Sequence, residues 1–406
     1  MSESWRVLPI PDHVRMMGEI GVLSLYEGFF SGGARILHTD VLTGLHGRDQ
    51  RHRVLSLHAE MFREATRQRM QDDSCHRKLV QAGVPVTALR ESAGPASFSV
   101  REIETYHELT ADARVVLSLK ESPLRLVNQA GPSRIPVITC LHRSDPENQA
   151  LDELRAAVRA GSIGALVCCA ESTRDAYRAA GIPAGLLQVI PNGVDLRRFR
   201  PDRRARAQLR AALGIPDDAP VITFAARYDG MKNVPLFLSA AAIMLANNPG
   251  AHIVMCGAGM TPANPGLATD RAVAGVGGCA RLHLLGVRDD PQAIFSASDV
   301  VTLTSSFGEA APLCLIEGLL CGAIPVSTDV GDSAAIVAGR GLLTEPDPEA
   351  IAAAWTEAFA RRGEFALALR AARPRFGRRR MLAAYASLIR RMCHTWSPSS
   401  TPQAVA

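Results

Sequence analysis

Short apolar runs rich in β-branched residues alternate with amphipathic segments in the first half of the chain. The apolar runs predict strands at residues 20–25, 53–57, 85–89, 114–119, 136–140, 165–169 and 188–190. Apolar positions at helical spacing between them predict helices, for example at residues 147–160 and 172–180. Repeated strand–helix–strand units of this kind build a parallel sheet that helices cover on both faces.

The alternation stops at a Pro-Asn-Gly turn, residues 191–193, and a charged, helix-prone stretch follows at residues 202–213. It restarts with a strand at Pro220, and later strands are predicted at residues 252–256, 281–285, 300–303, 324–327 and 341–343. The helices between them are predicted at residues 234–246, 291–297, 312–321 and 348–360. We therefore expect an α/β protein of two doubly wound, Rossmann-like units. Ligands should bind in the cleft between the units, outside the carboxyl ends of the strands.

The same pattern predicts how the chain is divided. Residues 1–195 and 196–372 are expected to form the two units, because the turn near residue 195 separates the two series of strands. Residues 373–395 are expected to form an arginine-rich closing helix, and residues 396–406 a disordered tail.

Composition singles out three positions. The chain has 406 residues, and 45 of them are Lys or Arg, but only Lys78, Lys120 and Lys232 are lysines. Codon bias of the source genome is the simplest explanation for the excess of arginine. Where arginine is the default cation, however, a retained lysine marks a position of interest.

Composition also argues against several classes of protein. No apolar run reaches the roughly 18 residues of a membrane span, and the start of the chain lacks the apolar stretch of a secretory signal. Nine cysteines without a Cys-x2-Cys pair indicate neither a disulfide framework nor a zinc site. Aromatic residues make up only 5% of the chain, so nucleic acid is not an expected partner. We therefore expect a cytoplasmic protein.

Arginines crowd into the last quarter of the chain. They form either a solvated helix face or a patch that faces an anionic partner or a membrane surface. The sequence leaves both interpretations open.

Two carboxylates eight residues apart mark the first candidate site. Glu309 falls in the loop after the strand predicted at residues 300–303, and Pro312 suits the first turn of the following helix. Glu317 lies farther along that helix, in an otherwise apolar stretch where an unpaired carboxylate is costly. Two carboxylates and the free N–H groups of a helix N-terminus together fit a sugar nucleotide, with its hydroxyls and its diphosphate. The alternative is a helix-capping glutamate and a buried structural ion pair.

Two cations mark the second candidate site. Arg227 and Lys232 lie in the loop between the strand that begins at Pro220 and the next helix. Two cations in such a loop can neutralise a diphosphate. The alternative is that they are ordinary surface cations.

Taken in order along the chain, these segments resemble the family 4 retaining glycosyltransferases of the GT-B fold. The resemblance rests on the Glu-x7-Glu and Arg-x4-Lys segments, and on Val-Ile-Pro-Asn-Gly-Val-Asp at residues 189–195 followed by Phe199. It also rests on a glycine-rich turn at residues 254–259, on residues 285–287 before Ala-Ser-Asp at residues 297–299, and on residues 31–35 and 140–142 near the N-terminal strands. These segments occur together and in the order of the family, from about residue 19 to residue 345, so the resemblance to the family is highly specific.

The resemblance implies a role for each candidate residue. In the C-terminal, nucleotide-sugar-binding unit, Glu317 would bind the ribose diol, and Arg227 and Lys232 would hold the diphosphate. Glu309 would bind hydroxyls of the donor sugar, together with backbone groups of the segment Ala310, Ala311, Pro312 and Leu313. Gly257 would belong to the glycine-rich turn, and Val287 would lie against the nucleobase.

The N-terminal unit would bind the acceptor. The resemblance implies that amides at Gly32 and Gly33 assist with the diphosphate and that His142 lies beside the transferred sugar. The catalytic set would thus be His142, Arg227, Lys232 and Glu309. In this family the last helix packs back onto the N-terminal unit, and residues 381–392 are placed to do so.

The chain departs from the family pattern at three places. Ala226 stands where glycine usually precedes the arginine, and Ala-Ala-Pro follows Glu309 instead of a glycine-containing turn. Residues 328–333 lack the second glycine and the later glutamate that many members carry.

The resulting expectation is a retaining glycosyltransferase that moves a hexosyl or N-acetylhexosaminyl group from a nucleoside diphosphate sugar, UDP-sugar by family frequency, to an acceptor hydroxyl. No Asp-x-Asp motif is present, so we expect neither a metal ion nor another cofactor. The acceptor and the oligomeric state are not predicted. The alternative is a sugar-nucleotide-binding or epimerising protein of the same fold. A dehydrogenase is disfavoured, because the turn at residues 257–262 lacks the third glycine of the dinucleotide motif.

Overall fold

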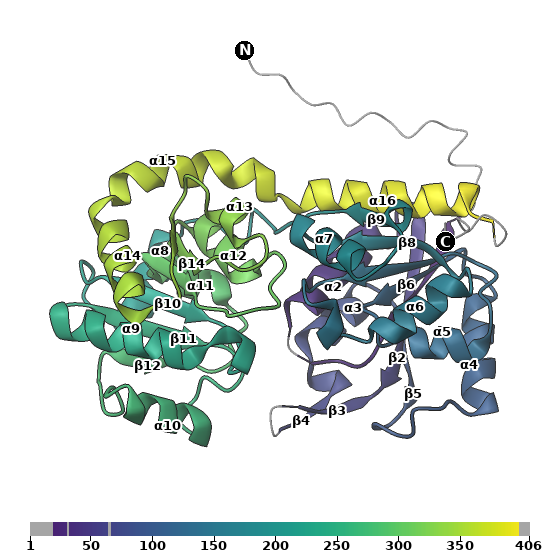
Figure 1. Cartoon of the computed structure of the whole chain (residues 1–406), viewed down its shortest axis with the longest axis horizontal. Helices are drawn as coiled ribbons and strands as arrows, with labels where there is room; N and C mark the ends of the chain where they lie inside the picture. Colours follow the sequence, from purple (N-terminus) through teal and green to yellow (C-terminus); the bar gives the residue numbers. More distant parts are fainter. Residues whose placement is uncertain (1–18, 31, 64–65, 398–406) are drawn as a thin grey trace, which may run out of the picture.

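The computed structural model describes residues 19–30, 32–63 and 66–397. Two α/β units lie end to end along the long axis of the molecule, and a long helix near the end of the chain runs along the N-terminal unit (Figure 1). The two doubly wound units predicted from the alternation of apolar and amphipathic segments are confirmed.

The N-terminal unit is built on a seven-stranded sheet in the order β5-β2-β1-β6-β7-β8-β9. Its strands are β1 (Ile20–Tyr26), β2 (Gln50–His58), β5 (Val86–Arg90), β6 (Val115–Leu119), β7 (Val137–Leu141), β8 (Ile163–Cys168) and β9 (Leu187–Val189). All neighbouring strands are parallel. Because helices cover both faces, β6 and β7 are buried along their whole length, which explains their continuous apolar runs.

The helices of this unit form two layers. One face of the sheet packs on α2 (Gly33–Leu45) and α3 (Ser74–Gln81), which contribute Leu37 and Leu79 to the core. The other face packs on α4 (Val100–Thr110), α5 (Leu124–Ala130), α6 (Leu151–Arg159) and α7 (Glu171–Ala179). Short 3-10 turns lie at Met70–Asp72, Pro146–Asn148 and Ala184–Leu186.

The C-terminal unit is built on a six-stranded parallel sheet in the order β12-β11-β10-β13-β14-β15. Its strands are β10 (Val221–Ala225), β11 (His252–Cys256), β12 (Leu282–Leu284), β13 (Val300–Leu303), β14 (Ile324–Thr328) and β15 (Leu342–Thr344). Its helices are α8 (Arg203–Ala212), η4 (Gly230–Lys232), α9 (Val234–Asn247), α10 (Pro265–Val273), α11 (Pro291–Ala297), α12 (Leu313–Cys321), α13 (Ser333–Val337), α14 (Pro348–Ala360) and α15 (Arg362–Ala372).

Helix α12 lies close against β13, and this contact fixes the place of the first candidate site. A β-carbon on Gly318 would lie 2.9 Å from Cβ of Val301, so the helix needs a glycine at this position. Leu315 and Leu319 are fully or almost fully buried in the core, and each contributes about 1.5–3 kcal/mol on burial.

The end of the chain crosses back to the N-terminal unit. After η5 (Arg373–Phe376), Gly377 pairs with Val194 in an isolated bridge, and α16 (Arg378–Thr395) then packs on the N-terminal core (Figure 1). Some of the crowded arginines fasten this helix: Arg390 pairs with Asp49, and Arg380 donates to the carbonyl of Pro191 at 2.9 Å. Both side chains are also exposed to solvent, so these contacts do not decide between the two interpretations left open by the sequence.

Several predicted bounds were wrong. The helix predicted at residues 147–160 begins only at Leu151, because Gln149 and Ala150 adopt non-helical backbone angles. The helix predicted at residues 312–321 begins at Leu313, and Pro312 occupies the N-cap position with an extended ψ of 117°. The segment predicted as one helix at residues 373–395 is interrupted at Gly377. Most of the predicted tail, residues 398–406, lies outside the described residues.

The antiparallel ribbon of β3 (Glu60–Arg63) and β4 (Thr66–Arg69) was not predicted. Its residues are largely polar, and an ion pair between Arg69 and Glu60, with Nε and Oε1 3.1 Å apart, ties its two strands together. Within the described ranges, no helix combines the length and the apolar character needed to span a membrane.

Candidate active site

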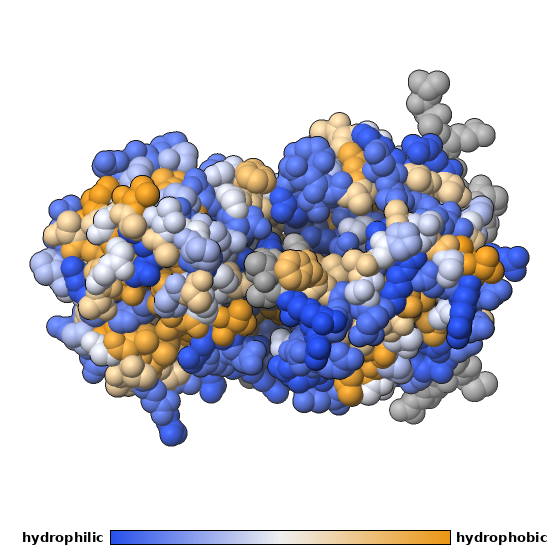
Figure 2. Space-filling model, turned by 90° about the horizontal axis from the view of Figure 1, so that it is seen from below, coloured by the Kyte–Doolittle hydropathy of each residue, from blue (hydrophilic) through white to orange (hydrophobic). Residues whose placement is uncertain are grey.

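A cleft of about 1380 Å³ lies between the two units. It is lined by the loops that follow strands of both sheets, including those after β1, β6 and β7 on one side and β10 and β11 on the other. Figure 2 shows the hollow that separates the two halves of the molecule. The cleft is where the topology predicts a ligand, at the carboxyl ends of the parallel strands.

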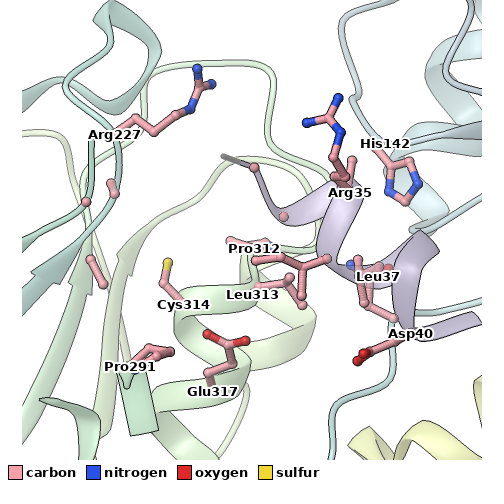
Figure 3. Close-up of a pocket in the computed structure, with 18 of the residues that line it drawn as sticks. Arg35, Leu37, Asp40, His142, Arg227, Pro291, Pro312, Leu313, Cys314 and Glu317 are labelled. Atoms are coloured by element: carbon pink, nitrogen blue, oxygen red, sulfur yellow. The ribbon is translucent and has the colours of Figure 1, made fainter. Parts of the chain in front are cut away.

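Every candidate residue named from the sequence lines this cleft. They are Gly32, Gly33, His142, Arg227, Lys232, Gly257, Val287, Glu309, Ala310, Ala311, Pro312, Leu313 and Glu317. Figure 3 shows Arg227 across the cleft from His142, with Pro312 and Leu313 between them and Glu317 farther along α12. The structure brings the set together; the individual roles stay predictions.

The Lys232 ammonium donates a hydrogen bond to Oε1 of Glu309 and forms an ion pair with it. The same oxygen accepts the hydroxyl of Ser305 at 2.6 Å. Both side chains are largely buried, with 14% and 8% of their surface exposed. A pair this well shielded from water is much stronger than a surface salt bridge. Glu309 is therefore not the helix N-cap of the alternative interpretation.

The backbone around Lys232 is held from the β13 side. The hydroxyl of Thr304 donates to the carbonyl of Lys232 at 3.0 Å. Asn233 adopts a left-handed conformation with φ 49°, and its side chain accepts a hydrogen bond from Leu236 N to cap α9. The loop between β10 and α9 is thus fixed before any ligand binds, which favours a preorganised site.

Arg227 is placed by the glycine-rich turn. Gly257 has φ +129°, and a β-carbon there would collide with the carbonyl of Ala226. The amide of Ala226 donates to Cys256 O at 2.9 Å, so the two loops are tied together at this point. The guanidinium of Arg227 lies 3.5 Å from Asp229, whose carboxylate also accepts Met231 N at 2.9 Å. Gly257 therefore helps to position Arg227, because a glycine at this place lets the two loops pack closely.

Glu317 is a carboxylate in a poorly solvated part of the cleft. Burial raises the pKa of Glu317 to about 8, and nearby Asp40 raises it further, while the charges of Arg198 and Lys78 oppose the shift. Among the described residues, its carboxylate makes no hydrogen bond or ion pair. The structural ion pair of the alternative interpretation is thus absent from the part of the chain that the structure describes. A ligand that donates hydrogen bonds would relieve the cost of this burial.

Two helix N-termini face the cleft. Helix α12 begins after Pro312 and helix α2 after Gly32, and no side chain of the described residues caps either start. The first N–H groups of both helices are therefore free for an anionic ligand. The helices approach each other at Gly33, where a β-carbon would lie 3.2 Å from Leu313 Cδ1.

His142 lies at the end of β7. Burial lowers its pKa to about 3, and the charge of Lys120 contributes to the shift, so the imidazole is neutral near pH 7. Its Nε2 is buried and has no hydrogen-bond partner among the described residues. An orphan buried nitrogen in a cleft is suited to a ligand hydroxyl.

Sequence reasoning missed most of the cations on the N-terminal wall of the cleft. All three lysines of the chain line the cleft, although only Lys232 was selected. Arg35 and Arg77 also line it, as does Arg143, which pairs with Asp145. The rarity of lysine was the available signal for Lys78 and Lys120; the arginines carry no comparable signal in so arginine-rich a chain.

The described residues contain no cluster of three or more His, Cys, Asp or Glu side chains arranged to hold a metal ion.

Comparison with known families gives two matches. Residues 31–198 match the family described as Glycosyltransferase Family 4, and residues 219–361 match Glycosyl transferases group 1. Together the two matches span most of the chain.

Among curated proteins, the chain is similar to D-inositol 3-phosphate glycosyltransferases. That of Saccharomonospora viridis is 33% identical over 154 residues, which cover 36% of this chain and 35% of the relative. That of Mycobacterium avium is 33% identical over 192 residues, which cover 41% of this chain and 43% of the relative. The similarity thus spans less than half the length of these relatives.

Among solved structures, the chain resembles Anabaena Alr3699/HepE in complex with UDP. The TM-score is 0.76 at 21% identity, over 91% of this chain and 100% of that one. Sucrose-phosphate synthase from Thermosynechococcus elongatus gives a TM-score of 0.71 at 18% identity, over 92% and 99% of the two chains. At these identities the likeness shows the fold.

Proposed function

The chain belongs to the family 4, group 1 glycosyltransferases, and we propose that it transfers a glycosyl group from a nucleoside diphosphate sugar to an acceptor hydroxyl. One observation carries the proposal: the thirteen candidate residues, drawn from both units, line a single cleft. That cleft offers cations, carboxylates and free helix N-termini, which are the groups that a sugar nucleotide requires.

The proposed donor is a UDP-sugar that carries a hexosyl or N-acetylhexosaminyl group. Arg227 and Lys232 would bind the diphosphate, Glu317 the ribose diol and Val287 the base. Glu309 and His142 would contact the sugar from opposite units. The family supports this assignment, and the likeness to Alr3699/HepE, whose structures contain UDP and UDP-glucose, agrees with it.

The proposed reaction retains the anomeric configuration and uses no protein nucleophile. The acceptor oxygen forms a bond to the anomeric carbon on the side from which the diphosphate departs. The bond between that carbon and the diphosphate oxygen breaks, and the acceptor proton passes to the diphosphate. Arg227, Lys232 and the N-terminus of α12 stabilise the charge on the leaving group, each well-placed donor contributing roughly 2.7–4 kcal/mol.

The N-terminal wall suits an acceptor with an anionic group. Five cations line the described part of this wall, against three carboxylates, Glu27, Asp40 and Asp195. The curated relatives are named for an inositol phosphate acceptor. A phosphorylated cyclitol is therefore the first acceptor to test.

A release assay tests the proposal. UDP release from a panel of UDP-sugars is measured with inositol 3-phosphate, with inositol, and without an acceptor, each with and without EDTA. We expect one donor to be consumed faster with the phosphorylated acceptor, whether or not EDTA is present, and the product to show the donor's anomeric configuration by NMR. Epimerised sugar nucleotide without free UDP, or donor binding without turnover, would favour the alternative protein of the same fold. Loss of turnover in EDTA, restored by Mg²⁺, would refute the metal-free mechanism.

A further inference from the structure

Asp332 of the C-terminal unit caps a helix of the N-terminal unit. Its Oδ2 accepts a hydrogen bond from Glu171 N at 3.0 Å, and its Oδ1 accepts one from Ser172 N at 2.9 Å. These amides open α7, which Figure 1 shows on the side of its unit that faces the other unit. The helix has Ala170 at its N-cap position, and alanine has no side-chain acceptor. The cap that α7 lacks locally is thus supplied from across the interface.

The bond pattern is favourable for a carboxylate. Both oxygens of Asp332 are used, each by one of the N–H groups that α7 leaves unpaired at its start. The negative charge also lies at the positive end of the helix dipole. Bonds of this charge-assisted kind are about twice as strong as neutral ones.

The backbone of the same residue supports the loop that carries Glu309. The amide of Asp332 donates to Ala310 O at 2.7 Å. Gly331, with φ +64°, packs so closely on that loop that a β-carbon would lie 2.6 Å from Ala310 O. Asp332 therefore touches α7 with its side chain and the loop of Glu309 with its backbone.

Further contacts between the units surround this loop. Asn192 Nδ2 donates to Ala311 O at 3.0 Å. Ala310 packs in a small apolar cluster with Cys169 and Ala170, the residue just before α7. The loop of residues 309–313 is thus held between the two units, and among the described residues Asp332 is the one acidic side chain of the C-terminal unit that accepts a hydrogen bond from α7.

We propose that Asp332 is a positioning residue that latches the two units in the arrangement of this structure, in which the two walls of the cleft face each other. The inference rests on the proposed function, in which His142 of one unit and Glu309 of the other contact the same sugar. When the latch is removed, the units separate more readily and the groups on opposite walls no longer act together. Asp332 lies in the segment of residues 328–333, which departs from the family pattern by lacking a second glycine.

The latch is tested with Asp332→Ala and Asp332→Asn. Asparagine has nearly the same shape as aspartate, but its NH2 group takes the place of one carboxylate oxygen and would face a backbone N–H of α7. We therefore expect Asp332→Asn, like Asp332→Ala, to weaken the contact between the units. Asp329→Ala is the matched control, because Asp329 lies three residues earlier in the same loop, is exposed, and makes no hydrogen bond to the described residues.

A second variant separates latching from helix capping. Asp332→Ala combined with Ala170→Ser gives α7 a cap of its own without a contact between the units. We expect this double variant to regain thermal stability lost in Asp332→Ala but to keep the loss of transfer. Recovery of both would show that Asp332 only caps a helix, and would overturn the proposal.

Two readouts are compared across these variants. We expect kcat to fall about tenfold or more in both Asp332 variants, while the Kd for UDP, whose predicted contacts belong to the C-terminal unit, changes less than about threefold. We also expect the radius of gyration with UDP, from small-angle X-ray scattering, to exceed that of the wild type and of Asp329→Ala. Wild-type scattering and kcat in Asp332→Ala would contradict the latch. The scattering comparison needs no turnover, so it tests the latch even if the transfer reaction itself is wrong.

Discussion

Lys232 and Glu309, 77 residues apart in the sequence, form an ion pair in the floor of the cleft. The sequence assigned them to different parts of a donor, the lysine to the diphosphate and the glutamate to the sugar. In the structure each neutralises the other, and Ser305 holds the same carboxylate oxygen at 2.6 Å. A donor diphosphate that binds the Lys232 ammonium must therefore compete with the carboxylate of Glu309 for it. Substitutions of the two residues test this competition.

Replacement of Lys232 tests the cation. Lys232→Ala is expected to lower transfer roughly 10²–10³-fold with the fold intact, because it removes a preorganised charge from the leaving group. Lys232→Arg is also expected to be impaired, because the bulkier planar guanidinium replaces a compact ammonium beside Glu309 and Ser305. Steady-state rates and circular dichroism provide the measurements. Arg379→Ala, which removes an exposed cation from α16, is the control; wild-type rates in Lys232→Arg would show that lysine has no special role.

Replacement of Glu309 tests the other partner. Glu309→Gln removes the charge that competes for Lys232, so UDP is expected to bind as tightly as to the wild type or a few times more tightly. Transfer is nevertheless expected to fall about 10²-fold or more, since the contact with the sugar is weakened. Calorimetry and rate measurements separate the two effects. A covalent glycosyl adduct on Glu309, detected by mass spectrometry, would contradict the mechanism without a protein nucleophile.

Glu317 predicts a pH dependence of donor binding. Burial raises its pKa to about 8 in the empty cleft, so at pH 6 the side chain is largely protonated. Diol hydroxyls donate hydrogen bonds to the ionised form, so binding must release the proton. Affinity for UDP-glucose is therefore expected to rise with pH, by up to tenfold per unit below about pH 8. Calorimetry between pH 6 and 8 gives the slope. Glu317→Gln should bind more weakly and without this slope; an unchanged slope would assign the proton to another group.

Because His142 is buried and neutral, we predict that the pH–rate profile shows no ionisation of this histidine. Because burial lowers its pKa to about 3, the imidazole is neutral throughout the working range and acts through a hydrogen bond. His142→Asn is expected to lower transfer about 10–100-fold. The pH–rate profile should keep the same shape in the variant. A limb near pH 6 that is present in the wild type and lost in His142→Asn would show that the imidazole titrates.

The fold could be predicted largely because parallel strands buried on both faces leave continuous apolar runs. The runs near Val115–Leu119 and Val137–Leu141 are such strands, and both were placed within a residue or two. Arg227, Lys232 and Glu309 could be selected from local pattern because they follow strands, and the carboxyl ends of parallel strands meet at one edge of a sheet. Gly32, Gly33, His142, Gly257 and Val287 were selected through the resemblance to the family.

The pairings across the chain could not be predicted. The bonds of Asp332 reach residues 160 and 161 positions away, and no local signal connects them. The ribbon at Glu60–Arg63 and Thr66–Arg69 was missed because its strands are polar and are stabilised by side-chain ion pairs. The raised pKa of Glu317 likewise depends on the walls of the cleft, which only the folded chain assembles.

In the proposed function, the cleft binds a nucleoside diphosphate through the cations of the C-terminal unit. Calorimetric titration of UDP into the wild type and into Arg227→Ala tests it most directly, because it needs neither the acceptor nor turnover. We predict one UDP per chain, and an affinity reduced about tenfold or more in the variant, with an unchanged melting temperature in the absence of nucleotide. Equal affinity for the two proteins, or no binding of UDP by the wild type, would contradict the account.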